Sequence, residues 1–352
     1  MSILNSKTYI EDLKFVVENT DIFNYFKSKS IFITGGTGLI GSGVVDLLLM
    51  ANYLKNLNIR ILVAARNESK AASRFSEFPY DSVLENVSYI SYDATNKNTL
   101  DFHADYIIHA ASNAHPKAFV DSPVDTMIAN IDGLKELLNY SKSNDVSNVL
   151  YVSSSEVYGQ KSTKEPFKEE EYGFLDILNP RNAYASSKRA SETLCASYYK
   201  QYGVKCSIIR PGHIYGPTAT KRDSRVGSSF AYCAAAGENI VMKSEGRQLR
   251  SYCHVLDCAT AILTVLSLGE PAIAYNISNR NSIISIMELA ELYAEEGNVE
   301  VVFDLPTELE KAAFNPMDNS SLDSARLEGL GWRGLFDAKL GTSHTIATLK
   351  EV

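Results

Sequence analysis

A glycine-rich loop between a strand-like run and a helix-like run is the feature that most constrains this chain. The run Ser30–Thr34 (S-I-F-I-T) is rich in β-branched and aromatic residues, and an apolar helical pattern covers Leu39–Leu54. Between them, T-G-G-T-G-L-I-G fits both G-x-G-x-x-G and G-x-x-G-x-x-G. Glycines let the backbone turn tightly and approach a pyrophosphate, whose charge the helix N-terminus stabilises. This context predicts dinucleotide binding rather than a purely structural turn, with contacts from Gly35, Gly38, Leu39, Ile40 and Gly41.

Strands and helices alternate along the chain after this loop. Further strands are predicted at 59–64, 87–92, 106–110, 149–153 and 205–210, with helices at 125–143 and 185–202. Many of the strands are apolar throughout, which is typical of a parallel sheet covered on both faces. The predicted fold class is therefore α/β, a doubly wound Rossmann-type parallel sheet with ligands beyond the carboxyl ends of its strands.

The pattern changes after residue 210, where Pro211-Gly212 and Gly216-Pro217 interrupt it and a basic loop follows. We expect an N-terminal extension over residues 1–29 and a Rossmann NAD(P)-binding domain over 30–211. Residues 212–352 are predicted to form mainly a smaller, mixed substrate-binding lobe, with segments near 251–268 returning to the main sheet.

Composition narrows the class of partner. The 352 residues are 45% apolar and 22% charged, as in soluble globular proteins, and 34 Lys+Arg against 42 Asp+Glu leave a net charge of −8. This charge argues against nucleic acid or an anionic membrane as a partner. The first residues carry charges instead of a signal-peptide core, and Val44–Ala51 is too short to span a bilayer. Five cysteines without a C-x-x-C pair predict a reduced, cytoplasmic protein with no structural metal.

The type of dinucleotide is indicated by the end of the second strand. An acidic residue that would bind the adenosine ribose is absent there, and Arg66 stands beside the expected position. Because arginine pairs with a 2′-phosphate, this favours NADP over NAD, although Arg66 stacking on adenine or facing water is an open alternative. Asp93, which follows the third strand, is a candidate for the adenine amino group and equally for a helix cap.

A tyrosine and a lysine one helical turn apart are the candidate acid–base pair. Tyr184 and Lys188 occur in Y-A-S-S-K, after the fifth strand. A phenol with an ordinary pKa of about 10 is a poor base at neutral pH, and nearby positive charges bring its pKa down. Ser154, at the carboxyl end of the fifth strand, is placed to hydrogen-bond the substrate oxygen that Tyr184 deprotonates; a serine-rich turn is the alternative.

Together these motifs resemble the extended short-chain dehydrogenase/reductases that act on nucleotide sugars as epimerases, dehydratases and decarboxylases. The resemblance runs from about residue 30 to 335 and includes His109-Ala110-Ala111, Asn130-x-x-Gly133, S-S-S-E-V-Y-G, Y-A-S-S-K, R-P-G-H-I-Y-G-P at 210–217 and R-S-Y-x-H-V-x-D at 250–257. It implies a tightly held NAD or NADP, a lobe that binds a nucleoside diphosphate sugar, and a homodimer built on paired helices. By this resemblance Ser154, Tyr184 and Lys188 match the catalytic triad and Arg250 an arginine on the diphosphate, while Ala110 and Lys188 also join the cofactor-binding set.

The resemblance further implies oxidation of the sugar at C4, with the later steps left open. Glu156 supplies a carboxylate that acts at C5 in dehydratases and decarboxylases, unless it turns away to pair locally. Ser155 stands where many dehydratases have an aspartic acid, and His213 replaces a usual asparagine, so both are candidate substrate contacts. His213 is expected to contact phosphate or titrate near neutrality, or else to be a core histidine. The leading hypothesis is a UDP-glucuronate decarboxylase-like enzyme, followed by a 4,6-dehydratase, a 4-epimerase, an NADPH-dependent keto-sugar reductase and a non-catalytic dinucleotide-binding protein.

Overall fold

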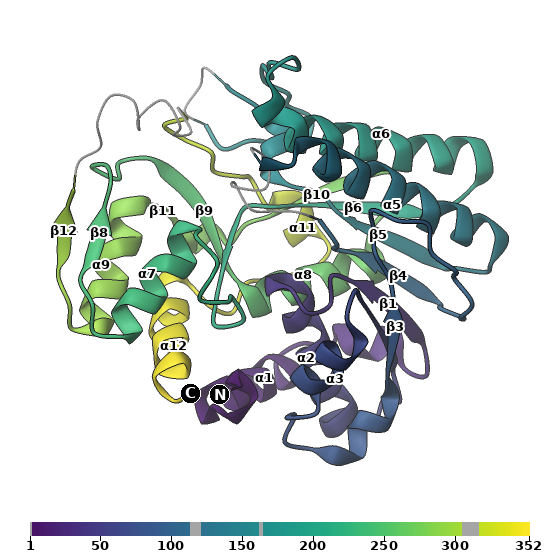
Figure 1. Ribbon diagram of the computed structural model, residues 1–352, viewed down its shortest axis with the longest axis horizontal. Helices are drawn as coiled ribbons and strands as arrows, with labels where there is room; N and C mark the ends of the chain where they lie inside the picture. The colour runs from purple at the N-terminus through teal and green to yellow at the C-terminus, as the bar shows by residue number, and fades with distance from the viewer. Residues whose placement is uncertain (1, 113–120, 162–164, 305–316) are drawn as a thin grey trace.

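Seven parallel strands form the main sheet, in the order β10-β6-β5-β4-β1-β2-β3. The computed structural model describes residues 2–112, 121–161, 165–304 and 317–352 (Figure 1). The strands are β1 (Ser30–Thr34), β2 (Arg60–Ala65), β3 (Val87–Ser91), β4 (Tyr106–His109), β5 (Asn148–Val152), β6 (Cys206–Pro211) and β10 (Ala274–Ile277). The Rossmann-type sheet predicted from the sequence is confirmed, and each of the six predicted strands begins and ends within one residue of its expected position.

Helices cover both faces of this sheet. On one face lie α2 (Leu39–Lys55), α3 (Glu68–Phe75) and α8 (Val255–Leu268), and on the other lie α5 (Pro123–Ser143) and α6 (Ala183–Tyr202) (Figure 1). Each face of the sheet has its own apolar core, and alternate residues of β1 point into one or the other. Ile31 and Ile33 pack toward α2 and α8, while Phe32 packs toward α5. The all-apolar strands therefore reflect burial on both faces.

The N-terminal extension is ordered and joins the two parts of the molecule. It contains η1 (Ile3–Asn5), α1 (Lys7–Glu18) and η2 (Ile22–Phe26), and α1 packs on both α2 and α12 (Ala338–Lys350). The Tyr9 hydroxyl donates to Asp46 of α2 at 2.8 Å, and Glu351 accepts from the Thr8 amide at 3.1 Å. The chain termini consequently lie side by side (Figure 1).

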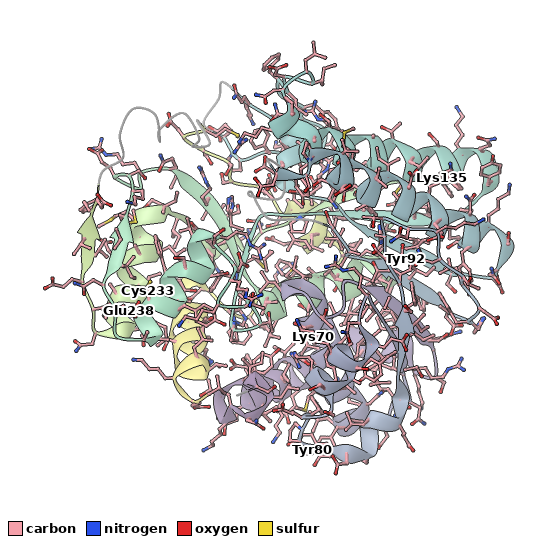
Figure 2. All side chains as sticks on the ribbon, viewed as in Figure 1. Lys70, Tyr80, Tyr92, Lys135, Cys233 and Glu238 are labelled. Atoms are coloured by element: carbon pink, nitrogen blue, oxygen red, sulfur yellow. The ribbon has the colours of Figure 1, made fainter. Side chains whose placement is uncertain are left out.

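The small lobe has two short sheets and its own apolar core. Strands β7 (His213–Tyr215), β9 (Leu249–His254) and β11 (Ile283–Ser285) form one sheet, and β8 (Ile240–Met242) pairs with β12 (Val301–Phe303). Helices α7 (Val226–Ala235), α9 (Ile286–Gly297) and α12 surround this core, while α11 (Ala325–Gly329) contacts β10. Figure 2 places Cys233 and Glu238 in this lobe, on the opposite side of the molecule from Tyr92 and Lys135.

The segment near residues 251–268, expected to return to the main sheet, is divided between the small sheet and a helix on the main sheet. Residues 249–254 form β9 in the small sheet, and 255–268 form α8, which covers the main sheet. The strand that joins β6 is β10, further along the chain. A parallel strand requires a crossover before it, and α8 is that crossover.

Across the described ranges, from residue 2 to 352 with gaps at 113–120, 162–164 and 305–316, no helix is long and apolar enough to cross a membrane.

Candidate active site

The glycine loop brings backbone amides to the carboxyl end of β1. Gly35 has a φ of +69°, and a Cβ there would lie 2.8 Å from the carbonyl carbon of Ala110. A Cβ on Gly41 would collide with the backbone of Gly35. Only glycine allows this close approach of the loop to the end of β4. Gly35 thus lies against both Gly41 and Ala110, and contact of these residues with a dinucleotide stays a prediction.

The first turn of α2 leaves amide groups directed at this surface. Gly38 is the N-cap of the helix, and the first bond that closes the turn runs from the Ser42 amide to the Gly38 carbonyl at 2.9 Å. The amides of Leu39, Ile40 and Gly41 therefore lack acceptors within the helix, as at any helix N-terminus. Such a cradle fits the pyrophosphate of a dinucleotide.

A buried histidine fastens the loop to β4. The Oγ1 atom of Thr34 lies 2.8 Å from Nδ1 of His109 and accepts from the Ala111 amide at 3.1 Å. Burial, and then the charge of Lys188, lower the pKa of His109 to about 3. The imidazole is consequently neutral and serves to hold Ala110 beside the glycines.

The residues expected to select the dinucleotide lie together at the ends of β2 and β3. Arg66 is exposed. Asp93 accepts from the Thr95 amide at 3.0 Å, from the Thr95 hydroxyl at 2.8 Å and from Asn96 at 3.0 Å. These bonds, led by the Thr95 amide and aided by the charge of Arg66, lower the pKa of Asp93. The carboxylate is thus engaged in its own turn, and contacts of Arg66 with a phosphate and of Asp93 with adenine stay predictions.

Tyr184 and Lys188 meet Ser154 at the carboxyl end of β5. Lys188 Nζ donates to the Val152 carbonyl at 2.7 Å and lies 5.6 Å from the centre of the Tyr184 ring. Burial raises the pKa of Tyr184 to about 12, although a hydrogen bond with the Ser154 side chain acts in the opposite direction. Burial lowers the pKa of Lys188 to about 7. The structure therefore brings the three predicted residues into one cluster.

Glu156 enters the same site from a short 3-10 turn, η4 (Ser155–Tyr158). Ser154 is the N-cap of this turn, and its Oγ accepts from the Glu156 amide at 3.2 Å. The Glu156 side chain reaches solvent, yet the loss of hydration among surrounding protein atoms raises the pKa of its carboxyl. The charges of Arg181 and Arg250 partly counter this shift. Ser155 is half-buried in the same turn.

The small lobe contributes Arg250 and His213. Arg250 is 5% exposed, and its Nη1 donates to the carbonyls of Leu249 at 2.8 Å and Met317 at 3.1 Å. Burial, and then the charges of Arg250 and Arg225, lower the pKa of His213 to about 3. This direction disfavours titration of His213 near neutrality, and its contact with a phosphate stays a prediction. Its Nδ1 atom is buried and bonds no atom of the described residues.

Two arginines at this site are absent from the sequence-based prediction. Arg181 lies close enough to Glu156, and Arg225 to Tyr184, to shift the pKa values of those groups. Asp223 holds Arg225 through a 2.9 Å bond from Nε. The basic loop after Pro217 is a signal for Arg225, but Arg181 follows a proline turn that gives no such indication.

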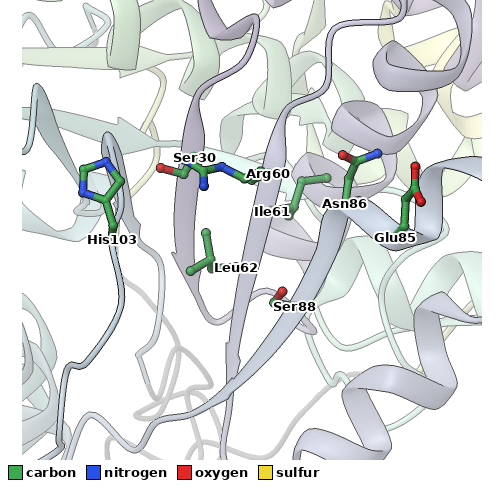
Figure 3. A pocket seen from close by; sticks show the side chains of 8 residues that line it. All are labelled: Ser30, Arg60, Ile61, Leu62, Glu85, Asn86, Ser88 and His103. Carbon is green, nitrogen blue, oxygen red and sulfur yellow. The ribbon is translucent and has the colours of Figure 1, made fainter.

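A pocket of about 430 Å³ lies away from this cluster, at the amino ends of β1, β2 and β3. Its lining residues are Ser30, Arg60, Ile61, Leu62, Glu85, Asn86, Ser88 and His103 (Figure 3). In a doubly wound sheet ligands bind at the carboxyl ends of the strands, so this pocket is no part of the candidate active site.

Comparison with family models agrees with this geometry. Residues 31–278 match the model of the NAD dependent epimerase/dehydratase family. The chain belongs to this family. The matched range contains the glycine loop, the Ser154–Tyr184–Lys188 cluster, Glu156 and Arg250, as well as β10, the last strand of the main sheet.

Proteins similar to this chain differ in the reactions that their names give. UDP-glucuronic acid decarboxylase 6 of Arabidopsis thaliana is 29% identical over 314 residues, which cover 88% of this chain and 85% of the relative. The dTDP-D-glucose 4,6-dehydratase of Homo sapiens is 28% identical over 349 residues, covering 92% of this chain and 91% of the relative. The structure of UDP-glucuronic acid 4-epimerase from Bacillus cereus, solved with UDP-glucuronic acid and NAD, superposes with a TM-score of 0.75 at 19% identity, covering 91% and 99% of the two chains. The first two support an enzyme that modifies a nucleotide sugar, and the third supports the fold.

Proposed function

We propose that this protein decarboxylates UDP-glucuronate through a 4-keto intermediate and that its NAD(P) is recycled within each turnover. The observation that carries the proposal is the convergence of Ser154, Tyr184 and Lys188 with Glu156 and a group of arginines at the carboxyl end of β5. Similarity to UDP-glucuronic acid decarboxylases supports the choice of sugar.

Tyr184 is the proposed base for the first step. Its phenolic oxygen accepts the proton of the sugar O4 hydroxyl as C4 is oxidised to a ketone, and Ser154 holds that oxygen by a hydrogen bond. Burial raises the pKa of Tyr184 to about 12, so a positive charge near the phenol is needed to favour the phenolate. Lys188 on the same helix is the residue placed to provide it.

The cradle formed by Gly35, Gly41 and the first turn of α2 would hold the dinucleotide. When bound, a nicotinamide dinucleotide supplies a reversible hydride acceptor. Arg66, exposed at the end of β2, is proposed to favour NADP. An Arg66→Ala variant should then lose at least tenfold in affinity for NADP and little for NAD, as measured by calorimetry; equal losses would assign Arg66 no part in the selection.

The arginines suit a carboxylated sugar. The charges of Arg181 and Arg250 lower the pKa of Glu156, and the charge of Arg225 lowers that of Tyr184. The reacting sugar ring would therefore lie among positive charges that can pair with carboxylate and diphosphate oxygens. Once C4 is a ketone, the C6 carboxylate belongs to a β-keto acid and leaves as carbon dioxide. The resulting enolate needs a proton at C5, and the raised pKa of Glu156 suits a carboxyl that holds one.

A 4,6-dehydratase is the second candidate, because Glu156 could equally abstract the C5 proton of a neutral hexose. The similarity to a human dTDP-D-glucose 4,6-dehydratase favours this alternative. The reactions differ in the mass they remove: decarboxylation releases carbon dioxide, whereas dehydration releases water.

A panel of UDP-, dTDP-, GDP- and CDP-sugars, incubated with the NAD- or NADP-loaded protein and followed by mass spectrometry, tests the proposal. We expect loss of carbon dioxide from UDP-glucuronate alone. Loss of water from a hexose would establish the dehydratase, an isomer of unchanged mass the epimerase, and net oxidation of NADPH with a keto sugar the reductase. A Tyr184→Phe variant serves as the matched control and should lose at least a thousandfold in turnover; full activity would refute Tyr184 as the base.

We also propose a homodimer formed through α5 and α6. Apolar side chains remain exposed near the start of α5, including Val124 at 66%, and the outer face of α6 carries small residues such as Ala190 and Ala196. A Val124→Glu, Ile128→Glu variant should elute as a monomer with monomeric mass by light scattering. Tyr25→Glu, which places the same charge on the exposed η2, is the control and should leave the dimer intact.

A further inference from the structure

A buried carboxylate under the catalytic cluster has no place in the reaction proposed above. Glu192 follows Lys188 by one turn of α6, and its side chain is almost wholly enclosed. Its Oε1 accepts from the Ser153 hydroxyl at 2.6 Å, and Ser153 directly precedes Ser154. Glu192 therefore contacts the end of β5 that carries the catalytic serine.

Arg210 fixes this carboxylate from the neighbouring strand β6. The guanidinium donates to Glu192 twice, from Nε to Oε1 at 2.9 Å and from Nη2 to Oε2 at 2.6 Å. The arginine is 1% exposed. A bidentate pair holds a carboxylate in one orientation, so Glu192 has little freedom to move.

The same guanidinium also secures the segment that follows the catalytic turn. Its Nη1 donates to the Tyr158 hydroxyl at 3.0 Å and to the Glu169 carbonyl at 2.7 Å, and its Nη2 donates to the Tyr172 hydroxyl at 2.9 Å. Tyr158 closes η4, the turn that carries Glu156. The Glu192–Arg210 pair thus links the Ser153–Ser154 end of β5 to Tyr158 of η4.

We propose that Glu192 is a positioning residue: anchored by Arg210, it fixes the Ser153–Ser154 end of β5 and places a negative charge one helical turn from Lys188. This inference rests on the proposed roles of Tyr184 and Lys188. Glu192 itself touches no reacting atom and acts through its neighbours.

The electrostatics around Lys188 support this placement. Burial lowers the pKa of Lys188, and Glu192 is the first of the groups that counter it. The other titratable groups that face the ammonium are Tyr184 and Cys195 on α6, Tyr151 on β5 and His109 on β4. None of these is an anion at neutral pH, since burial raises the pKa values of the two tyrosines and the cysteine and His109 is neutral.

The test is a Glu192→Gln variant, which keeps the shape of the side chain and removes its charge. The pKa of Lys188 is measured by the pH dependence of its reductive methylation in the intact protein, followed by mass spectrometry. We expect this pKa to fall by about one unit or more and turnover at pH 7 to fall at least tenfold, with the KM for the nucleotide sugar within about twofold. A Lys188 pKa equal to that of the wild type would overturn the inference.

Further variants separate positioning from folding. Asp46→Asn removes the charge of a buried carboxylate from the Asp46–Arg74 pair and should lower stability while leaving the Lys188 pKa and turnover unchanged. If Glu192→Gln fails to fold, a Glu192→Met, Arg210→Met variant replaces the pair by apolar side chains of similar size. A folded double variant with the wild-type Lys188 pKa and full turnover would equally overturn the inference.

Failure of the proposed function gives a different result. If the wild type converts no nucleotide sugar, the decarboxylase proposal is wrong, whereas the methylation measurement on Lys188 still decides the role of Glu192.

Discussion

The ion pairs Glu192–Arg210 and Asp46–Arg74 each have a buried carboxylate but differ in how fully their polar atoms are bonded. Both oxygens of Glu192 accept hydrogen bonds, and all three guanidinium nitrogens of Arg210 donate. In the other pair one oxygen, Asp46 Oδ2, takes both donors, from Arg74 at 2.6 Å and from Tyr9 at 2.8 Å. Within the described residues, Oδ1 of Asp46 and Nη1 of Arg74 have no partner.

The difference also appears in the pKa values. Burial would lower the pKa of Arg210, but the bonds to Glu192 outweigh it and leave the value above the ordinary one. Burial raises the pKa of Asp46, and Arg74 only partly restores it. A complete network stabilises both of its charges, whereas in the incomplete one the pKa of the carboxyl stays above its ordinary value. The complete network lies under the catalytic cluster, and the incomplete one attaches the N-terminal extension.

Arg210→Met should cause the largest loss of stability. It leaves Glu192 buried without its counter-ion, which costs about 3–5 kcal/mol when one partner of a buried pair is removed. Urea unfolding followed by circular dichroism measures the change. A loss below about 1 kcal/mol would show that the network is not the stronger of the two.

Asp46→Asn should cost less, about 2 kcal/mol, because the pair has fewer bonds to lose. The substitution should also change the pH dependence of stability. Since the pKa of Asp46 is raised in the folded state, the stability that this carboxyl contributes decreases as pH rises from about 4 through its folded-state pKa. Unfolding across this range should show the decrease in the wild type and not in the variant; equal slopes would contradict the assignment.

Tyr9→Phe removes one hydroxyl from the same group and should cost about 1 kcal/mol. The ring of Tyr9 is fully buried and stays in place, so only the bond to Asp46 is tested. In an Asp46→Asn background the cost should shrink, and a double-mutant cycle from urea unfolding measures the coupling. Full additivity would mean that the two side chains do not interact.

Glu351→Gln should have the smallest effect, about 0.5 kcal/mol or less, because the carboxylate is exposed and screened by solvent. Bonds from the side chains of Ser6 and Thr8 lower the pKa of Glu351. Its contribution is therefore present above the ordinary pKa and lost as pH falls through the lower folded value, the opposite direction to Asp46. Thermal unfolding of variant and wild type between pH 3 and 7 would reveal the difference, and an increase of the contribution in acid would contradict it.

The sequence predicts those features whose cause is local. The strands are apolar runs bounded by turns, and the glycine loop and the Tyr184–Lys188 pair each lie within one short segment. Their positions at the carboxyl ends of β1 and β5 follow from the alternation of strands and helices.

What the sequence leaves out depends on long-range packing. Arg181 and Glu156 come together only when the loop after β5 folds back, and Arg210 meets Glu192 only because β6 pairs beside β5 under α6. The lowered pKa of His213 likewise depends on the burial of its imidazole and on the charges of Arg250 and Arg225. Residue type and spacing do not predict contacts between segments that are distant in the sequence.

The contact between Glu351 and α1 has a consequence for how the chain folds as it is synthesised. Glu351 accepts from Ser6 at 2.6 Å across a sequence separation of 345 residues. During synthesis α1 can pack on α2 early, since Tyr9 and Asp46 are 37 residues apart, but the bonds that Ser6 and Thr8 donate to Glu351 form only after α12 has been made. A nascent chain therefore presents this end of α1 to its surroundings until α12 and Glu351 have left the ribosome.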